Sequence, residues 1–207
     1  MAILREQLQL IRSPKATITR LASDPSAAFV GFKHVLLLAV LYELVIVLWA
    51  FGGATPTIPA FLKIPDDQYY YYQLIFEIPM ILIVWLLAGG IAYVLSKALG
   101  GNGSYDTILG GFGITALISF YFVLIPDFIQ GLLWTTGWVP FAEYQEATSR
   151  GPLVVLVWGY MLAFNVSYLV LYTVTIRYSQ NLGKLKSAFA AAISFYASIA
   201  IFITITR

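Results

Sequence analysis

Five long apolar stretches dominate the chain, separated by short segments that hold most of the polar side chains. Each stretch is close to the ~20 residues that a helix needs to cross the roughly 30 Å hydrocarbon layer of a bilayer. The stretches lack the alternation of apolar and polar residues that is typical of barrel strands, so we expect helices. The sequence therefore predicts an all-α, polytopic transmembrane bundle over residues 33–207, with spans at 33–51, 73–95, 107–133, 152–176 and 187–205.

The third predicted span contains a polar interruption. Pro126 removes a backbone donor, and Asp127 adds a carboxylate at the next position. We therefore expect this helix to be the most irregular of the five. If residues 107–133 did not cross the membrane, four spans would remain and the C-terminus would lie on the same side as the N-terminus.

The segment 1–32, before the first span, has a different pattern. Ser13-Pro14 and Asp24-Pro25 are typical helix starts, in which a capping residue precedes a proline. We expect short amphipathic helices that lie in the lipid headgroup layer. The alternative is that the same apolar face packs on the protein's own loops. The apolar positions of the first helix are Ile3, Leu4, Leu8 and Ile11, and its polar positions are Arg5, Glu6, Gln9 and Arg12.

Composition supports a membrane protein and limits its chemistry. Hydrophobic residues make up 60% of the chain, and charged residues make up 11%, against roughly 25% in soluble domains. The chain has no cysteine and one histidine, so it cannot by itself build a disulfide, a thiolate site or a histidine cluster. We expect no metal, no cofactor and no catalytic residues, and we interpret His34 as a polar residue at the membrane interface. The net charge of +2 is too small to indicate nucleic-acid binding.

Basic residues are unevenly distributed between the two sides of the predicted bundle. With five spans, one side holds nine Lys and Arg residues and the other holds three, out of twelve in the chain. Because loops rich in Lys and Arg stay in the cytoplasm, we expect a cytoplasmic N-terminus and a C-terminus on the far side. Six basic residues on the richer side are candidate contacts for lipid headgroups or partners: Arg5, Arg12, Lys15, Arg20, Lys184 and Lys186.

Three carboxylates, Glu43, Glu77 and Asp127, fall within the apolar runs. A charge at bilayer depth costs at least ~2.5–3.5 kcal/mol on insertion scales, so these residues are candidates for function. Glu43 lies about ten residues, or ~15 Å, into the first span, near the midplane. Glu77 and Asp127 lie closer to the far side, at similar depth, and can face each other.

These carboxylates have a functional and a structural interpretation. They can line a proton or cation path, or a polar pocket for a headgroup. Alternatively, each is uncharged or hydrogen-bonded to a neighbouring helix. We expect Glu43 to be uncharged, because no Lys or Arg lies in the central layer of the membrane. Candidate hydrogen-bond partners are Tyr42, Asn165, Ser167 and Tyr168.

Small residues recur four positions apart in two of the spans. The second span has Ala88 and Ala92, and the last span has Ala190 and Ser194. Such spacing allows the backbones of two helices to approach closely. We expect these faces to pack within the chain by default, although contact with a second chain would use the same pattern.

Three segments resemble, in order along the chain, motifs of the Ypt-interacting-protein (YIP) family. Residues 12–17 (RSPKAT) and 21–25 (LASDP) are similar to the opening of prokaryotic members, with Ile18 or a neighbour in place of a phenylalanine. Residues 99–105 (LGGNGSY) resemble the family's turn between the second and third spans. Residues 181–189 (NLGKLKSAF) resemble its basic turn before the last span.

The resemblance implies a five-pass helical protein of a prokaryotic cytoplasmic membrane, with a cytoplasmic N-terminus. Eukaryotic relatives bind prenylated Rab-type GTPases and use a long cytoplasmic N-terminal region. Residues 1–32 are much shorter than that region, so GTPase binding is not expected here. The resemblance supplies no catalytic residues to transfer.

Two functions are compatible with the sequence. The first is a non-enzymatic membrane scaffold or accessory subunit that binds membrane lipids and other membrane protein subunits, or a second copy of itself. The alternative is a small transporter, channel or lipid-handling protein that uses the buried carboxylates. A water-filled cavity that reaches Glu43 would favour transport. A dry bundle with a small-residue groove open to another chain would favour the scaffold.

Overall fold

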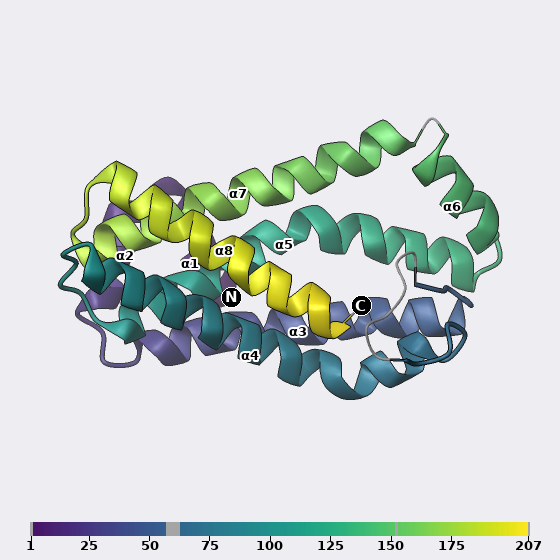
Figure 1. Ribbon diagram of the computed structural model, residues 1–207, viewed down its shortest axis with the longest axis horizontal. Helices are drawn as coiled ribbons and strands as arrows, with labels where there is room; N and C mark the ends of the chain where they lie inside the picture. Colours follow the sequence, from purple (N-terminus) through teal and green to yellow (C-terminus); the bar gives the residue numbers. More distant parts are fainter. Residues whose placement is uncertain (1, 57–62, 152, 207) are drawn as a thin grey trace.

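A computed structural model describes residues 2–56, 63–151 and 153–206, and this part of the chain contains helices and turns but no strand (Figure 1). The prediction of an all-α protein is confirmed. In chain order the helices are α1 (Ala2–Arg12), α2 (Pro14–Ala22), α3 (Ala27–Phe51), α4 (Tyr69–Ala98), α5 (Tyr105–Thr135), α6 (Phe141–Ser149), α7 (Val154–Gln180) and α8 (Lys184–Thr206).

Five of the described helices, α3, α4, α5, α7 and α8, are long and apolar enough to cross a membrane. This confirms the five helices expected from the hydrophobic pattern. The helices continue beyond the apolar runs, since α3 begins at Ala27 and α4 begins at Tyr69. At 1.5 Å per residue, α4 and α5 are about 45 Å long, so they exceed the ~30 Å hydrocarbon layer.

Helix α5 forms the centre of the bundle, and α3 lies parallel to it (Figure 1). In the most apolar stretch of α5, 78% of the residues are buried within the protein, whereas the corresponding share in α7 is 11%. Gly31 of α3 faces Gly110 and Gly113 of α5, and a Cβ on any of these glycines would collide with the backbone of the other helix. Farther along the pair, the Thr135 hydroxyl donates a hydrogen bond to the Leu48 carbonyl at 2.9 Å. Close backbone approach therefore holds the central pair together.

Helices α4, α7 and α8 complete the bundle around this pair. The hydroxyl of Ser194 in α8 donates to the carbonyl of Ala88 in α4 at 2.5 Å, and Ala190 is fully buried. In α7, Tyr172 stacks on Phe112 of α5 with 3.5 Å between ring centroids. The Ala88 and Ser194 faces found in the sequence therefore join helices of one chain.

Helix α5 runs through Pro126 as one continuous helix, so the proline does not divide the third span. Helix α4 likewise contains Pro79. A proline in a membrane helix frees one backbone carbonyl, which is tolerated where neighbouring groups or local adjustments satisfy it. Asp127 and Gln130, which follow the proline, are both buried against other helices.

The N-terminal helices pack on the bundle through Ile18 and other buried side chains. Helix α2 begins at Ser13-Pro14 as expected, whereas α3 begins two residues after Pro25, with Ser26 at its N-cap. Asp24 accepts hydrogen bonds from the hydroxyl and the backbone N–H of Ser26, at 2.6 and 2.8 Å. These bonds, with a smaller contribution from nearby cations, hold the pKa of Asp24 below its usual range.

Helix α6, which the apolar pattern did not indicate, lies at the end of the bundle opposite α2 (Figure 1). Its Phe141 and Tyr144 rings pack edge-on against Trp134 of α5, with centroids 4.9 and 5.3 Å apart. Burial, aided by nearby Tyr160 and Asp127, raises the pKa of the Tyr144 hydroxyl. We call this the α6 end, and we call the end with α2, the α4–α5 turn and the α7–α8 turn the basic end.

Candidate functional site

Glu43 and Glu77 lie close enough together for their charges to interact. The sequence indicated that Glu43 lies deeper in the membrane than Glu77. However, α3 begins at Ala27, before the expected start of the first span at residue 33. Glu43 is therefore ~24 Å along this helix and nearer the α6 end. Glu77 is fully buried, and one of its oxygens accepts a hydrogen bond from the Gln73 amide at 2.7 Å. Its other oxygen and one oxygen of Glu43 are buried without a hydrogen-bond partner among the described residues.

Two of the four side chains named as candidate partners for the carboxylates are hydrogen-bonded elsewhere. The Ser167 hydroxyl pairs with Ser119 at 2.9 Å, and the Asn165 amide donates to the Met161 carbonyl at 2.8 Å. The third, Tyr168, packs edge-on against Phe164 and Tyr172. The fourth candidate, Tyr42, packs edge-on against Trp49 and Phe120.

Asp127 occupies a separate polar cluster between α5, α6 and α7. It is 6% exposed and lies near the hydroxyls of Tyr144 and Tyr160. Gln130, one turn of α5 beyond Asp127, also lies near Tyr160. The cluster joins three elements at the α6 end, which suits a structural role for this carboxylate.

His34, which was expected at the membrane interface, is fully buried within the protein. The reason is that α1 covers it. Its Nδ1 atom lies 2.8 Å from the Val30 carbonyl, and its Nε2 atom lies 3.4 Å from the Ile3 carbonyl and 3.5 Å from the Glu6 carboxylate. In addition, the hydroxyl of Tyr121 in α5 donates to the Gln7 side chain at 3.2 Å. Polar contacts therefore attach α1 to both α3 and α5.

Helix α1 has three faces. The inner face, which includes Gln7 and Leu10, is buried against the bundle. A polar face exposes Arg5 and Arg12. Between them lies an outward apolar ridge that is 41–60% exposed, which we call the α1 ridge: Leu4, Leu8 and Ile11. Part of the apolar surface of this helix therefore packs on the protein, as the second sequence interpretation expects, and part is open.

Lys15 and Arg20 lie together in a groove between α2 and the end of α7, here called the α2 groove. Hydroxyl groups surround the two cations, and Tyr178 of α7 closes one side. Cations beside hydroxyl donors suit a phosphate or another anionic group. The groove is lined by Ser13, Pro14, Lys15, Ala16, Thr19, Arg20, Ser23 and Tyr178.

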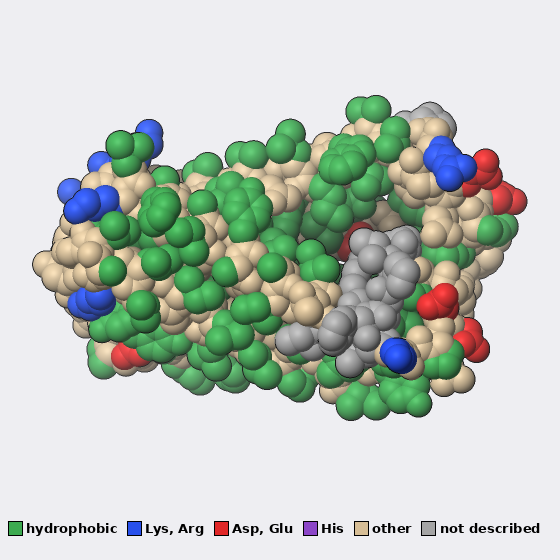
Figure 2. Space-filling view, viewed as in Figure 1, with side chains coloured by type: hydrophobic (Ala, Val, Ile, Leu, Met, Phe, Trp, Pro, Cys, Tyr) green, Lys and Arg blue, Asp and Glu red, His purple; other side chains and the backbone are tan. Residues whose placement is uncertain are grey.

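Lys184 and Lys186 line a second groove at the same end, between the α4–α5 and α7–α8 turns. The Lys186 ammonium donates to the Leu99 carbonyl at 2.8 Å, which fixes its position. Leu185 between them is 86% exposed. Figure 2 shows most of the Lys and Arg side chains of this face at the basic end and most of its acidic side chains at the α6 end, with a broad apolar surface between the two ends.

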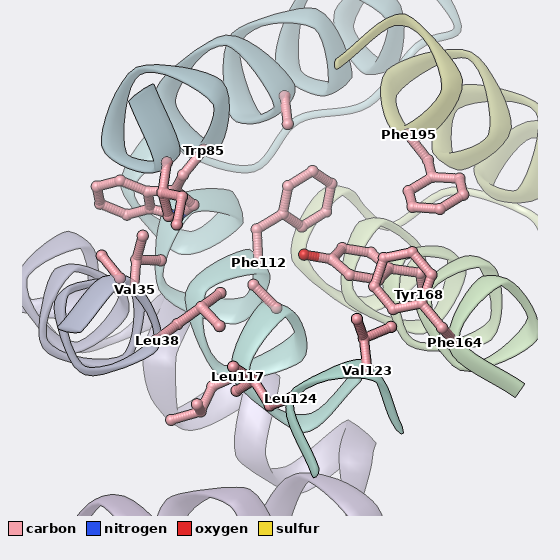
Figure 3. Close-up of a cluster of buried hydrophobic side chains, with 14 of the residues drawn as sticks. Val35, Leu38, Trp85, Phe112, Leu117, Val123, Leu124, Phe164, Tyr168 and Phe195 are labelled. Carbon is pink, nitrogen blue, oxygen red and sulfur yellow. The ribbon is translucent and has the colours of Figure 1, made fainter. Parts of the chain in front are cut away.

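An apolar cavity of about 520 Å³ lies inside the bundle and is lined by all five long helices. Figure 3 shows Phe164, Tyr168 and Phe195 gathered from α7 and α8, with Phe112 and Val123 from α5. None of Glu43, Glu77 and Asp127 lines this central cavity. This cavity is therefore not the water-filled route to Glu43 that would favour transport.

Comparison with known protein families gives a match over most of the chain, in which the model of the Yip1 domain covers residues 8–206. The chain belongs to the Yip1 domain family. No curated protein and no solved structure matches it. The match confirms the family resemblance that the three sequence motifs indicated.

Two of these Yip1-domain motifs meet at the basic end. The Asn102 backbone N–H donates to the Gln180 carbonyl at 3.2 Å, and the Asn181 side chain donates to the Asn102 side chain at 2.8 Å. The Gln180 amide donates to the Ser104 carbonyl at 3.1 Å. Gly103 lies against the backbone of Ser179, where a Cβ would not fit. Motif residues far apart in the sequence thus form one structural unit.

Sequence reasoning missed several residues of these sites in the Yip1-domain bundle. Tyr178 of the α2 groove gave no signal, because its position depends on how α2 crosses the end of α7. Trp85, Phe164 and Phe195 of the central cavity are ordinary apolar residues in the sequence. Only the packing of five helices distinguishes a cavity wall from a filled core.

Proposed function

We propose that this Yip1-domain protein is a non-enzymatic membrane scaffold or accessory subunit whose basic end binds anionic lipid headgroups. The observation that carries the proposal is that Lys15, Arg20, Lys184 and Lys186 surround two grooves at one end of the bundle. Basic side chains beside exposed apolar residues, such as those of the α1 ridge, suit the boundary between headgroups and acyl chains. The basic end then faces the cytoplasm, where loops rich in Lys and Arg are retained.

Helix α7 supplies the surface for a partner subunit in this proposal. Only 11% of its most apolar stretch is buried within the chain, the lowest value among the five long helices. Its Gly159 has open space where a side chain would be, so another helix can approach its backbone closely. Ion transport has less support, because the central cavity is apolar and the carboxylates lie outside its lining.

Isolation from native membranes in a mild detergent tests the scaffold role. We expect another membrane protein to co-purify in a fixed ratio. A chain that purifies alone and discharges an ion gradient in liposomes would contradict the proposal and support the transport alternative.

The headgroup site is tested by neutralising the α2 groove. A basic residue near an anionic surface contributes about 1 kcal/mol, so Lys15→Gln with Arg20→Gln should weaken phosphatidylglycerol binding about 30-fold. Native mass spectrometry of the detergent-purified protein, titrated with phosphatidylglycerol, measures this change. The matched control is Lys63→Gln with Arg150→Gln, which removes two charges from the α6 end and should leave binding unchanged. Equal loss in both variants would show that only net charge matters.

A further inference from the structure

We infer that the central cavity holds one hydrocarbon chain of a membrane lipid, which enters between α7 and α8. The site is separate from the headgroup grooves of the proposed function. Its volume of about 520 Å³ lies within the ~300–1,000 Å³ that is usual for small-molecule sites. It is too large to be a packing defect, because voids larger than a water molecule are rare in protein interiors.

The mouth of the cavity is identified by which lining residues are exposed. Met161 of α7 and Tyr196 and Ile203 of α8 are 38%, 53% and 46% exposed. Most residues that line it from the other helices, such as Trp85 of α4 and Val35 of α3, are buried. The cavity therefore opens sideways between two membrane-spanning helices, toward the acyl chains of the bilayer.

Several polar groups of the lining are paired with backbone carbonyls. The Trp85 indole donates to the Leu109 carbonyl, and the Asn165 amide donates to the Met161 carbonyl of its own helix. The Ser198 hydroxyl donates to the Phe195 carbonyl at 2.9 Å. The lining offers few free donors to water or to a headgroup, and apolar cavities of this kind stay dry.

A hydrocarbon chain satisfies these conditions. It adds the dispersion contacts that an empty apolar cavity lacks, and it requires no hydrogen bond. The bilayer supplies such chains at the mouth. The headgroup of the bound lipid remains outside the cavity, since the lining has no charged residue.

Trp85 provides a reporter inside the cavity. Its indole N–H donates to the Leu109 carbonyl at 3.1 Å, so its ring is fixed. The other tryptophans, Trp49, Trp134, Trp138 and Trp158, can be changed to Phe. Among them, Trp49 and Trp134 have buried indole nitrogens without a hydrogen-bond partner in the described part of the chain, so the change removes no bond there.

The experiment places this single-tryptophan protein in vesicles of phosphatidylcholine with a dibrominated acyl chain. We expect the bromine atoms to quench Trp85, relative to vesicles without bromine. Ala116→Phe, which fills the cavity from α5, should abolish the quenching. Ala200→Phe, on the exposed face of α8, is the matched control and should retain it. If Ala116→Phe does not fold, Val84→Phe in the α4 wall makes the same test.

Three results would overturn the inference. Equal quenching with and without Ala116→Phe would mean that lipid outside the cavity is responsible. Quenching by water-soluble acrylamide would mean that water fills the cavity. Insensitivity to both quenchers, together with a dimer in detergent, would mean that a second copy covers the mouth. None of these results affects headgroup binding at the basic end, so the two proposals fail separately.

Discussion

Glu77 is fully buried in α4, and only one of its two oxygens accepts a hydrogen bond from a described residue. Its donor, Gln73, lies one turn earlier and is 5% exposed. The sequence indicates both residues and their spacing, because both follow from position along one helix. The approach of Glu43 to Glu77 could not be predicted, since it depends on how far α3 extends at its start. At this scale, local spacing is predictable and contacts between helices are not.

Removal of the Gln73 donor should destabilise the protein. Gln73→Leu leaves the buried Glu77 carboxyl without its hydrogen bond, at a cost of about 1–3 kcal/mol. The double change Gln73→Leu with Glu77→Leu should cost less than the single change, because it leaves no unpaired polar group. Unfolding in dodecyl sulfate measures both. Additive losses would mean that the two side chains do not depend on each other.

Asp24 should make a small, pH-dependent contribution to stability. Its pKa is lowered in the folded protein by the Ser26 hydrogen bonds, so the contribution is present above the unfolded pKa of about 4. It is lost as the pH falls through the lower folded value. Asp24→Asn should therefore lower the thermal midpoint at pH 7, and the difference from the unaltered protein should disappear in acid. Asp67→Asn, in the exposed turn before α4, is the control. A difference that persists unchanged in acid would contradict this account.

Among the elements, the parallel α3–α5 pair depends most on glycine. The backbones of Gly31 and Gly113 touch, so neither position has space for a side chain. The small-residue repeats noted in the sequence lie in the second and last spans, so they do not indicate this pair. The presence of each long helix can be predicted from the length of its own apolar run, without knowledge of the other helices. Helix pairing follows from the fit of distant surfaces, and the short helix α6 depends on its contact with Trp134.

Gly113→Ala should weaken this pair. The added methyl group collides with the α3 backbone, and overpacking of this kind costs about 1–3 kcal/mol. Gly90→Ala in α4 is the matched control, because nothing lies within 4 Å of the position that its Cβ would occupy. That change should stabilise the protein by about 0.5–1 kcal/mol through helix propensity. The two variants should shift the unfolding midpoint in opposite directions, and shifts of the same sign would contradict the proposed packing.

For the whole molecule, the separation of charge between the two ends predicts an orientation. The chain has no cysteine, so Lys97→Cys and Glu143→Cys each introduce one reactive group, at the basic end and the α6 end. In intact cells, a maleimide that does not cross membranes should label Glu143→Cys only. Lys97→Cys should react after the membrane is permeabilised. The reverse pattern would place the basic end outside the cytoplasm.

The parallel arrangement of α3 and α5 also has a consequence for biosynthesis. The ribosome completes α3 and then α4 before α5 exists, so α3 enters the membrane without its principal partner. During that interval the consecutive helices α3 and α4 can already bring Glu43 and Glu77 together, away from lipid. The glycine contacts of α5 form afterwards. The order of synthesis thus allows Glu43 and Glu77 to meet first and the close-packed centre to assemble later.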